Sequence, residues 1–181
     1  MEFFDKSRVY IDTQILIGTI IDKTEQKTIY TKLIDSIINS HDYEVHLPQI
    51  IIGECFCKLV QKSENSNNKL ATNVKCFQEL IVKIMPNEHI RCNCFPILEE
   101  GILNKALEIK KSDSRLDYFD SLIVSHAILD SQAGILYTED SSIIESSFIQ
   151  ELINERDPLW KEFHIKDPYL HLRKTKKVKR Y

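Results

Sequence analysis

Arg8-Val-Tyr-Ile-Asp12, near the start of the chain, is typical of a short buried strand that ends at an acidic residue. The apolar stretch that follows, residues 14–21, predicts a short helix. A strand followed at once by a helix is the opening unit of an α/β fold with a mainly parallel sheet. In such sheets, binding and catalytic sites form beyond the carboxyl ends of the strands, where Asp12 stands. Candidate site residues are therefore expected at this edge.

Strands and helices alternate along the rest of the chain. Further strands are predicted over residues 43–47, 89–95, 134–138 and 159–165. Helices are predicted over residues 24–39, 49–62, 70–84, 96–110, 116–129 and 141–149, with a polar loop over residues 63–68. We expect a three-layer α/β/α fold around a central, mainly parallel sheet of about four to five strands, in one domain over residues 1–166.

The composition limits the kinds of site that this chain can form. It has 181 residues, enough for one domain of ordinary size. Its 4 glycines are scattered singly, which excludes the glycine-rich loops that bind phosphates through backbone amides. A metal held by carboxylates is the other common way to bind a phosphate. The start of the chain has no apolar signal segment, and no apolar run reaches the ~20 residues of a membrane span. The 5 cysteines are an odd number. We therefore expect a cytoplasmic protein with free thiols.

Two aspartates come at or just after the ends of predicted strands. Asp12 follows residues 9–11, and Asp140 lies two residues after the strand that ends at Thr138. Position alone suits two roles equally well. Each aspartate is either a member of a site at the sheet edge or a residue that caps a loop or helix.

Asp120 lies within the helix predicted over residues 116–129, between Phe119 and Ile123 on the apolar side of a helical wheel. An ionised carboxylate there has to be paired, hydrogen-bonded or bound to a metal, because burying a bare charge is costly. The alternative is a helix start, with Asp117 as the N-cap and Asp120 in the first turn. That alternative accounts for Asp117 better than for Asp120, whose neighbours on the wheel are core residues.

Glu54 points away from the apolar stripe of its predicted helix, which includes Ile51, Cys55 and Phe56. Spacing alone therefore predicts an exposed side chain that pairs with Lys58 one turn later. Nothing in the helix pattern assigns Glu54 to a site.

Four short motifs occur in order along this chain: Tyr10-Ile11-Asp12-Thr13, Ile51-Ile52-Gly53-Glu54, Tyr118-Phe119-Asp120-Ser121 and Leu136-Tyr137-Thr138-Glu139-Asp140. Together, over roughly residues 8–150, the chain resembles the PIN-domain nucleases, which carry four acidic motifs in this order. The resemblance implies that the catalytic, metal-binding acids are Asp12, Glu54, Asp120 and Asp140. It implies that Thr13 and Thr138 support the site, and that Asp117 is either an accessory acid or only the helix cap. Gln14 stands where the family more often has Asn or Ser.

The resemblance implies an endoribonuclease that depends on Mg²⁺ or Mn²⁺, the ions that ligand sets made only of oxygen favour. A bound ion would activate water, so no Ser, His or Cys nucleophile is required. Some members of the family are toxins, and for that role an antitoxin or another protein partner is expected, with a homodimer left open. The alternative is a non-catalytic PIN-like module that binds RNA or protein.

A basic tail over residues 167–181 is the one break in composition. The formal charge of the chain is -3, but residues 171–181 hold six basic residues and no acid. The remaining residues 1–170 therefore contain 18 basic and 27 acidic residues, which gives them a net charge of -9. The basic residues of the tail are Arg173, Lys174, Lys176, Lys177, Lys179 and Arg180. They would bind RNA phosphates, contact another protein, or form a solvated end.

Other combinations of residues point to chemistry less strongly. The pairs Cys55-x-Cys57 and Cys92-x-Cys94 resemble part of a zinc site, but no His follows them at the spacing of a zinc finger. Two cysteines at this spacing on a helix also point about 200° apart. His126 is expected to be a hydrogen-bonded core residue.

Two further patterns suggest other chemistry. Trp160 and Phe163 would either stack on bases or seal the last strand onto the core. A haloacid-dehalogenase-like phosphatase needs Asp-x-Asp after the first strand, whereas Gln14 stands at the second acid's position here.

Overall fold

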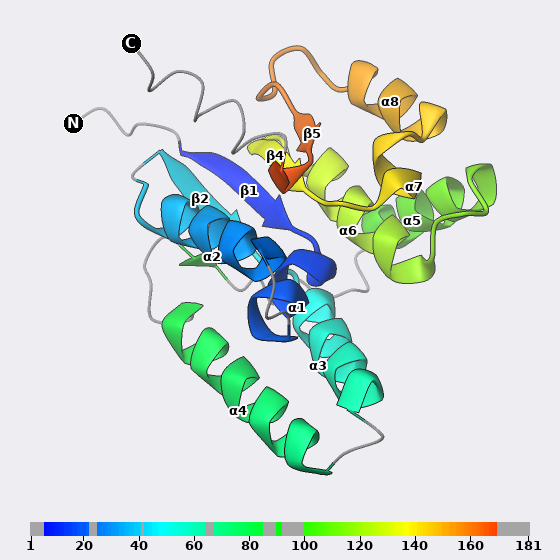
Figure 1. Ribbon diagram of the computed structural model, residues 1–181. Helices are drawn as coiled ribbons and strands as arrows, with labels where there is room; N and C mark the ends of the chain where they lie inside the picture. Colours follow the sequence, from blue (N-terminus) through cyan, green and yellow to red (C-terminus); the bar gives the residue numbers. More distant parts are fainter. Residues whose placement is uncertain are drawn as a thin grey trace.

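The fold is built on a five-stranded sheet whose paired strands are all parallel, in the order β3-β2-β1-β4-β5. It is seen in a computed structural model that describes residues 6–21, 25–40, 42–63, 67–84, 90–91 and 100–169. The strands are β1 (Ser7–Ile11), β2 (Tyr43–His46), β3 (Ile90–Arg91), β4 (Ala133–Tyr137) and β5 (His164–Lys166). Figure 1 shows β1 at the centre of the molecule. The predicted α/β fold with a parallel sheet is confirmed.

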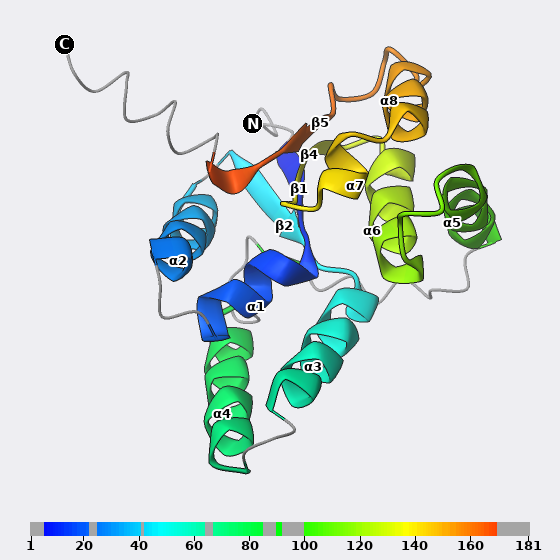
Figure 2. The same cartoon turned by 45° about the vertical axis from the view of Figure 1, so that its right-hand side comes forward.

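The helices cover both faces of the sheet. They are α1 (Thr13–Ile21), α2 (Glu25–Ile38), α3 (Gln49–Ser63), α4 (Asn67–Ile84), α5 (Glu100–Ser112), α6 (Tyr118–Leu129), α7 (Ser141–Ile144) and α8 (Ser147–Asn154). Figure 2 shows α1 and α2 on one side of the sheet and α5 and α6 on the other. Helices on both faces produce the three-layer arrangement expected of a parallel sheet.

The core follows from the two central strands. Every residue of β4 is buried, and so are the last three residues of β1, because helices cover both of their faces. α6, which packs on β4, has a run of buried residues from Ile123 to Ile128. A nearly uniform apolar sequence, rather than a clear amphipathic stripe, is what a helix between two packed layers requires.

Three predicted boundaries differ from the structure. The helix predicted over residues 141–149 is two helices, because Glu145 ends α7 and Ser146, with an extended backbone (ψ 113°), starts α8. The strand predicted over residues 159–165 is limited to β5, because Asp157 holds the preceding segment in a turn through the backbone N–H of Leu159. The predicted polar loop is shorter than expected, since Ser63 still belongs to α3 and α4 begins at Asn67. Residues 92–99, which include part of a predicted strand and the start of a predicted helix, lie outside the described residues.

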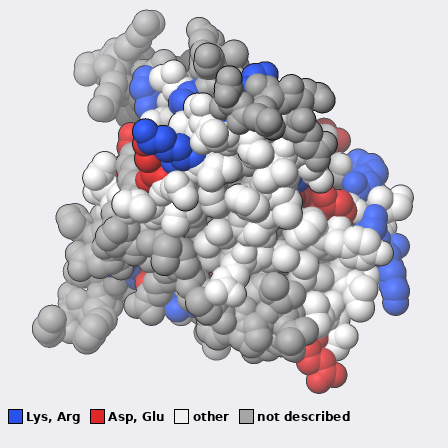
Figure 3. All heavy atoms as spheres, turned by 90° about the horizontal axis from the view of Figure 1, so that it is seen from below, with Lys and Arg blue, Asp and Glu red and all other residues white. Residues whose placement is uncertain are grey.

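Charge is spread unevenly over the surface. Figure 3 shows a face with acidic and basic side chains mainly toward its edges and uncharged residues across its middle. None of the helices in the described part of the chain is long and apolar enough to span a membrane.

Candidate active site

Asp12 and Asp140 lie together at the carboxyl edge of the sheet because β1 and β4 are parallel neighbours. Thr138 connects them: its hydroxyl donates a 2.6 Å hydrogen bond to Oδ2 of Asp12 and accepts one of 3.0 Å from the backbone N–H of Asp140. Asp140 also caps α7, since its Oδ1 accepts a hydrogen bond from the N–H of Ser142. Asp140 thus caps a helix and also lies beside Asp12, so both roles left open for it by sequence are compatible in the structure.

Glu54 is buried at this same edge, so the expectation of an exposed side chain is wrong. Its side chain is only 4% exposed. Its Oε2 accepts a 2.5 Å hydrogen bond from the hydroxyl of Thr13, and its Oε1 is paired with the ammonium group of Lys58. The predicted pairing with Lys58 is confirmed. The helical wheel failed because the face of α3 that packs against α1, α4 and α6 is turned from the predicted stripe toward Glu54. Glu54 is buried, while Phe56, which lies on the predicted stripe, is 45% exposed.

Asp117 and Asp120 form a reciprocal capping box at the start of α6. Oδ1 of Asp117 accepts a 2.8 Å hydrogen bond from the N–H of Asp120, and Oδ2 of Asp120 accepts one of 2.9 Å from the N–H of Asp117. The helix-start alternative therefore describes both residues. Asp120 is half-buried rather than enclosed in the core.

The acids nevertheless act on one another electrostatically. Burial, followed by the negative charges of Asp117, Asp12 and Asp140, raises the pKa of Asp120 to about 7, against the opposing hydrogen bond from the N–H of Asp117. Burial also raises the pKa of Asp12 to about 6, and the charge of Glu54 adds to this effect. The hydrogen bond from Thr138 and the charge of Lys58 act in the opposite direction. A cation placed among these groups would stabilise their ionised forms.

The donor set fits a divalent cation in charge and in chemistry, because it consists of carboxylate oxygens from four segments of the chain. As the side chains stand, no group of three His, Cys, Asp or Glu residues within the described ranges is arranged to hold one ion. The contacts given above explain this, since Glu54 is paired with Lys58 and Asp120 caps its own helix. A carboxylate can bind an ion through one oxygen while the other keeps its hydrogen bond, so Asp120, whose Oδ2 caps the helix, retains Oδ1 as a ligand atom.

Comparison with known proteins shows the family of the chain. A family model described as PIN domain matches residues 9–148, which is most of the chain. The chain belongs to the PIN-domain family. Proteins with this domain are generally nucleases that use divalent metal ions. All four acids of the candidate site lie within the matched region.

A solved structure has the same fold as this PIN domain. It is the crystal structure of VapBC2 from Rickettsia felis bound to a DNA fragment from their promoter. One of its chains is 15% identical to this chain, with a TM-score of 0.50, and the match covers 88% of this chain and 99% of that chain. No curated protein matched the sequence. At this level of identity the likeness describes the fold.

Within the part of the chain that the structure describes, the remaining candidate residues do not form a second cluster. Cys55 is buried in the core and Cys57 is exposed, so the two do not share a site; Cys92 and Cys94 lie outside the described residues. His126 is buried as predicted, but its Nε2 has no hydrogen-bond partner within the described structure, so the expected hydrogen bond is not found there. Burial lowers the pKa of His126, and the negative charge of Asp130 acts in the opposite direction.

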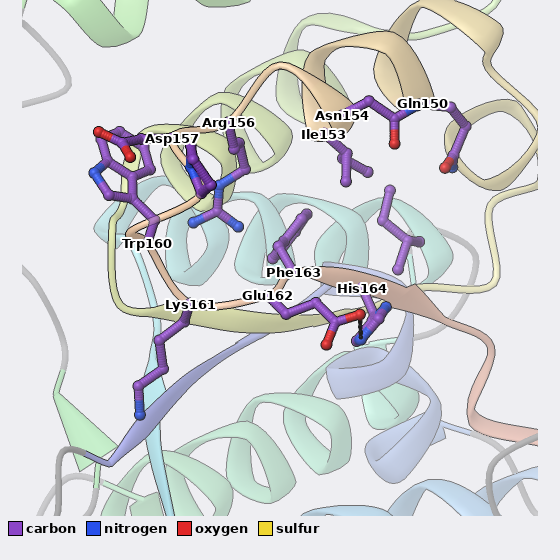
Figure 4. A pocket seen from close by; sticks show the side chains of 12 residues that line it. Gln150, Ile153, Asn154, Arg156, Asp157, Trp160, Lys161, Glu162, Phe163 and His164 are labelled. Atoms are coloured by element: carbon purple, nitrogen blue, oxygen red, sulfur yellow. Dashed lines mark ion pairs between the residues drawn. The ribbon is translucent and has the colours of Figure 1, made fainter.

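A cavity of about 470 Å³ lies at the opposite, amino edge of the sheet and is shown in Figure 4. Arg156 lines this cavity, and its guanidinium lies 5.4 Å from the ring centroid of Trp160 and 4.9 Å from that of Phe163. Arg156 also donates a 2.7 Å hydrogen bond to the carbonyl of Asp130. Both aromatic rings are therefore engaged with Arg156, and Phe163 is buried, which favours the sealing role over base stacking. The tail residues Arg173 to Arg180 lie outside the described residues.

Proposed function

We propose that this PIN domain is a divalent-metal-dependent endoribonuclease that hydrolyses RNA phosphodiesters. The observation that supports this most directly is the convergence of acids from β1, α3, α6 and the end of β4 on one edge of the sheet. The raised pKa values of Asp12 and Asp120 support it further, since they arise from burial first and from the charges of neighbouring acids second, a combination common at functional sites.

In this proposal the metal ligands and catalytic acids are Asp12, Glu54, Asp120 and Asp140. A bound Mg²⁺ or Mn²⁺ would activate water and offset the charge of the phosphodiester. The threonines orient the acids: Thr138 holds Asp12, and Thr13 holds Glu54. Asp117 holds the start of α6, which places Asp120 beside the other acids.

Cleavage of RNA in Mg²⁺ or Mn²⁺ by wild type and by Asp120→Asn tests the proposal. The variant should lose at least about 100-fold in rate, the scale of removing one charged group that acts on the transition state. Asp42→Asn is the matched control, because Asp42 is exposed and precedes β2 at the other edge of the sheet. Equal cleavage by Asp120→Asn and wild type would show that the site is assigned wrongly. Absence of metal-dependent cleavage by wild type would refute the proposed nuclease activity.

A non-catalytic module that binds RNA or protein is the second candidate. It is favoured by the contacts of Glu54 and Asp120, which hold both side chains in arrangements that do not surround an ion. Isothermal titration with Mn²⁺ separates the two candidates. A nuclease should bind Mn²⁺ in a way that Asp120→Asn weakens, whereas a module without a metal site should show no such difference.

We also propose a protein partner of antitoxin type and a role for the basic tail. The solved structure that shares this fold is of VapBC2 on promoter DNA. A partner that covers the acidic edge should protect RNA from cleavage, which co-expression with the neighbouring reading frame can test. In the proposed division, residues 1–166 form the nuclease domain and the tail over residues 167–181 binds RNA. Truncation after Leu170 should weaken RNA binding and flatten its salt dependence.

A cytoplasmic location is part of the same proposal, and free thiols at Cys55, Cys57 and Cys76 are compatible with it.

A further inference from the structure

A second cavity of about 480 Å³ adjoins the acidic edge and has a different chemical character. Residues of α1, α2 and α3 line it, and its polar members are Gln14, Lys58, Gln61 and Lys62. Its volume falls within the roughly 300–1,000 Å³ typical of sites for small ligands.

The cavity and the acids share residues at their boundary. Lys58 lines the cavity and is paired with Glu54, so its ammonium group lies where the two meet. Gln14 also lines the cavity, and its backbone N–H is hydrogen-bonded to the carboxylate of Asp12. A polymeric ligand whose reacting group lies beside Asp12 and Glu54 would therefore extend directly into the cavity.

The charge of the cavity suits a polyanion. Its lining includes two lysines and no acidic residue, although residues 1–170 carry a net charge of -9. An RNA strand that approaches the acidic edge is repelled by most of this body, and lysines beside the acids would offset that repulsion locally.

One wall of the cavity is held in place before any ligand binds. A Cβ added at Gly18 would lie 2.1 Å from Cε2 of Tyr30, so α1 and α2 approach closely only because residue 18 is glycine. The Tyr30 ring is buried, and its hydroxyl donates a hydrogen bond to the carboxylate of Glu139. A preformed wall lowers the ordering cost of binding.

We propose that this cavity binds the RNA backbone next to the phosphodiester that is cut. Lys62 contacts a phosphate, Lys58 lies between that phosphate and Glu54, and the amides of Gln14 and Gln61 face the sugar or base of the same nucleotide. The inference rests on the proposed nuclease function, to which it adds the site that positions the substrate.

The test measures RNA binding separately from cleavage. All proteins carry Asp120→Asn so that the RNA stays intact, and a fluorescent single-stranded RNA is titrated in Mg²⁺ over a range of salt concentrations. Lys62→Gln should bind about fivefold more weakly at 0.1 M salt, and the slope of log K against log salt should fall by about 0.7, the value for one phosphate contact on a single strand. Lys62→Arg should restore both values.

Lys111→Gln is the matched control, because Lys111 is an exposed lysine in the last turn of α5, on the other side of the sheet. If Lys62→Gln has the affinity and salt slope of Lys111→Gln, the cavity inference is refuted. If Lys62→Gln loses binding although the protein without Asp120→Asn never cleaves RNA, the nuclease proposal fails and the cavity stands as an RNA-binding site.

Discussion

Replacing Asp12 with Asn tests whether the acidic edge destabilises the protein when no metal is bound. Burial, with the charge of Glu54 adding to it, raises the pKa of Asp12 from 3.8 to about 6. Because each pKa unit corresponds to about 1.4 kcal/mol, ionised Asp12 costs the folded state up to about 3 kcal/mol. Asn removes the charge and keeps an oxygen that can accept the hydrogen bond from Thr138.

The sign of the pH dependence follows from the raised pKa. The folded protein binds this proton more tightly than the unfolded chain does, so stability decreases as the pH rises from about 4 to about 6, and the cost is fully present above that range. Asp12→Asn should therefore unfold later than wild type at pH 8, by up to about 6–12 °C at roughly 2–4 °C per kcal/mol for a chain of this size. At pH 5 the difference should be about half as large in free energy.

Thermal unfolding in EDTA at pH 5 and pH 8 measures both quantities, with Asp42→Asn as the control for an exposed aspartate. Addition of Mn²⁺ at pH 8 should stabilise wild type more than Asp12→Asn, because only the folded wild type has the full set of acids to bind the ion. The electrostatic reasoning is wrong if Asp12→Asn is less stable than wild type at pH 8, or if the difference between them is the same at both pH values.

Three further substitutions test contacts near the site. Gly18→Ala should destabilise the protein by about 1–3 kcal/mol in a denaturant titration, since the added Cβ would meet the ring of Tyr30 at 2.1 Å. Gly53→Ala should stabilise α3 by roughly 0.5–1 kcal/mol in the same titration, because no heavy atom lies within 4 Å of the added Cβ. Thr138→Val removes the hydroxyl that lowers the pKa of Asp12, so the pH at which Asp12 titrates by carbon-13 NMR should rise, and an unchanged or lower value would contradict the hydrogen bond.

Local signals in the sequence were sufficient for much of this protein. Alternation of short apolar runs with helical stretches predicted the parallel sheet, because each strand must be buried on both faces and each helix on one. Asp12 and Asp140 could be placed at the carboxyl edge because they follow the strands that end there. Asp117 could be identified as a helix cap because the cap is formed within four residues of chain.

Other features depended on elements that are distant in sequence. The wheel for α3 predicted an exposed Glu54, whereas in the structure Glu54 is buried and accepts a hydrogen bond from Thr13 at the start of α1. Hydrophobic spacing could not predict the division between α7 and α8 either, since the division depends on the backbone conformation of Ser146.

The sequence by itself determined which residues could form a site, namely a set of carboxylates at the ends of strands and starts of helices. The tertiary structure decided the burial, charge environment and contacts of each of those residues. Burial and mutual charge depend on distances across the fold, so the raised pKa values of Asp12 and Asp120 and the pairing of a buried Glu54 with Lys58 follow only from packing. The lysine-lined cavity beside the acids arises in the same way, because it exists only where α1, α2 and α3 meet.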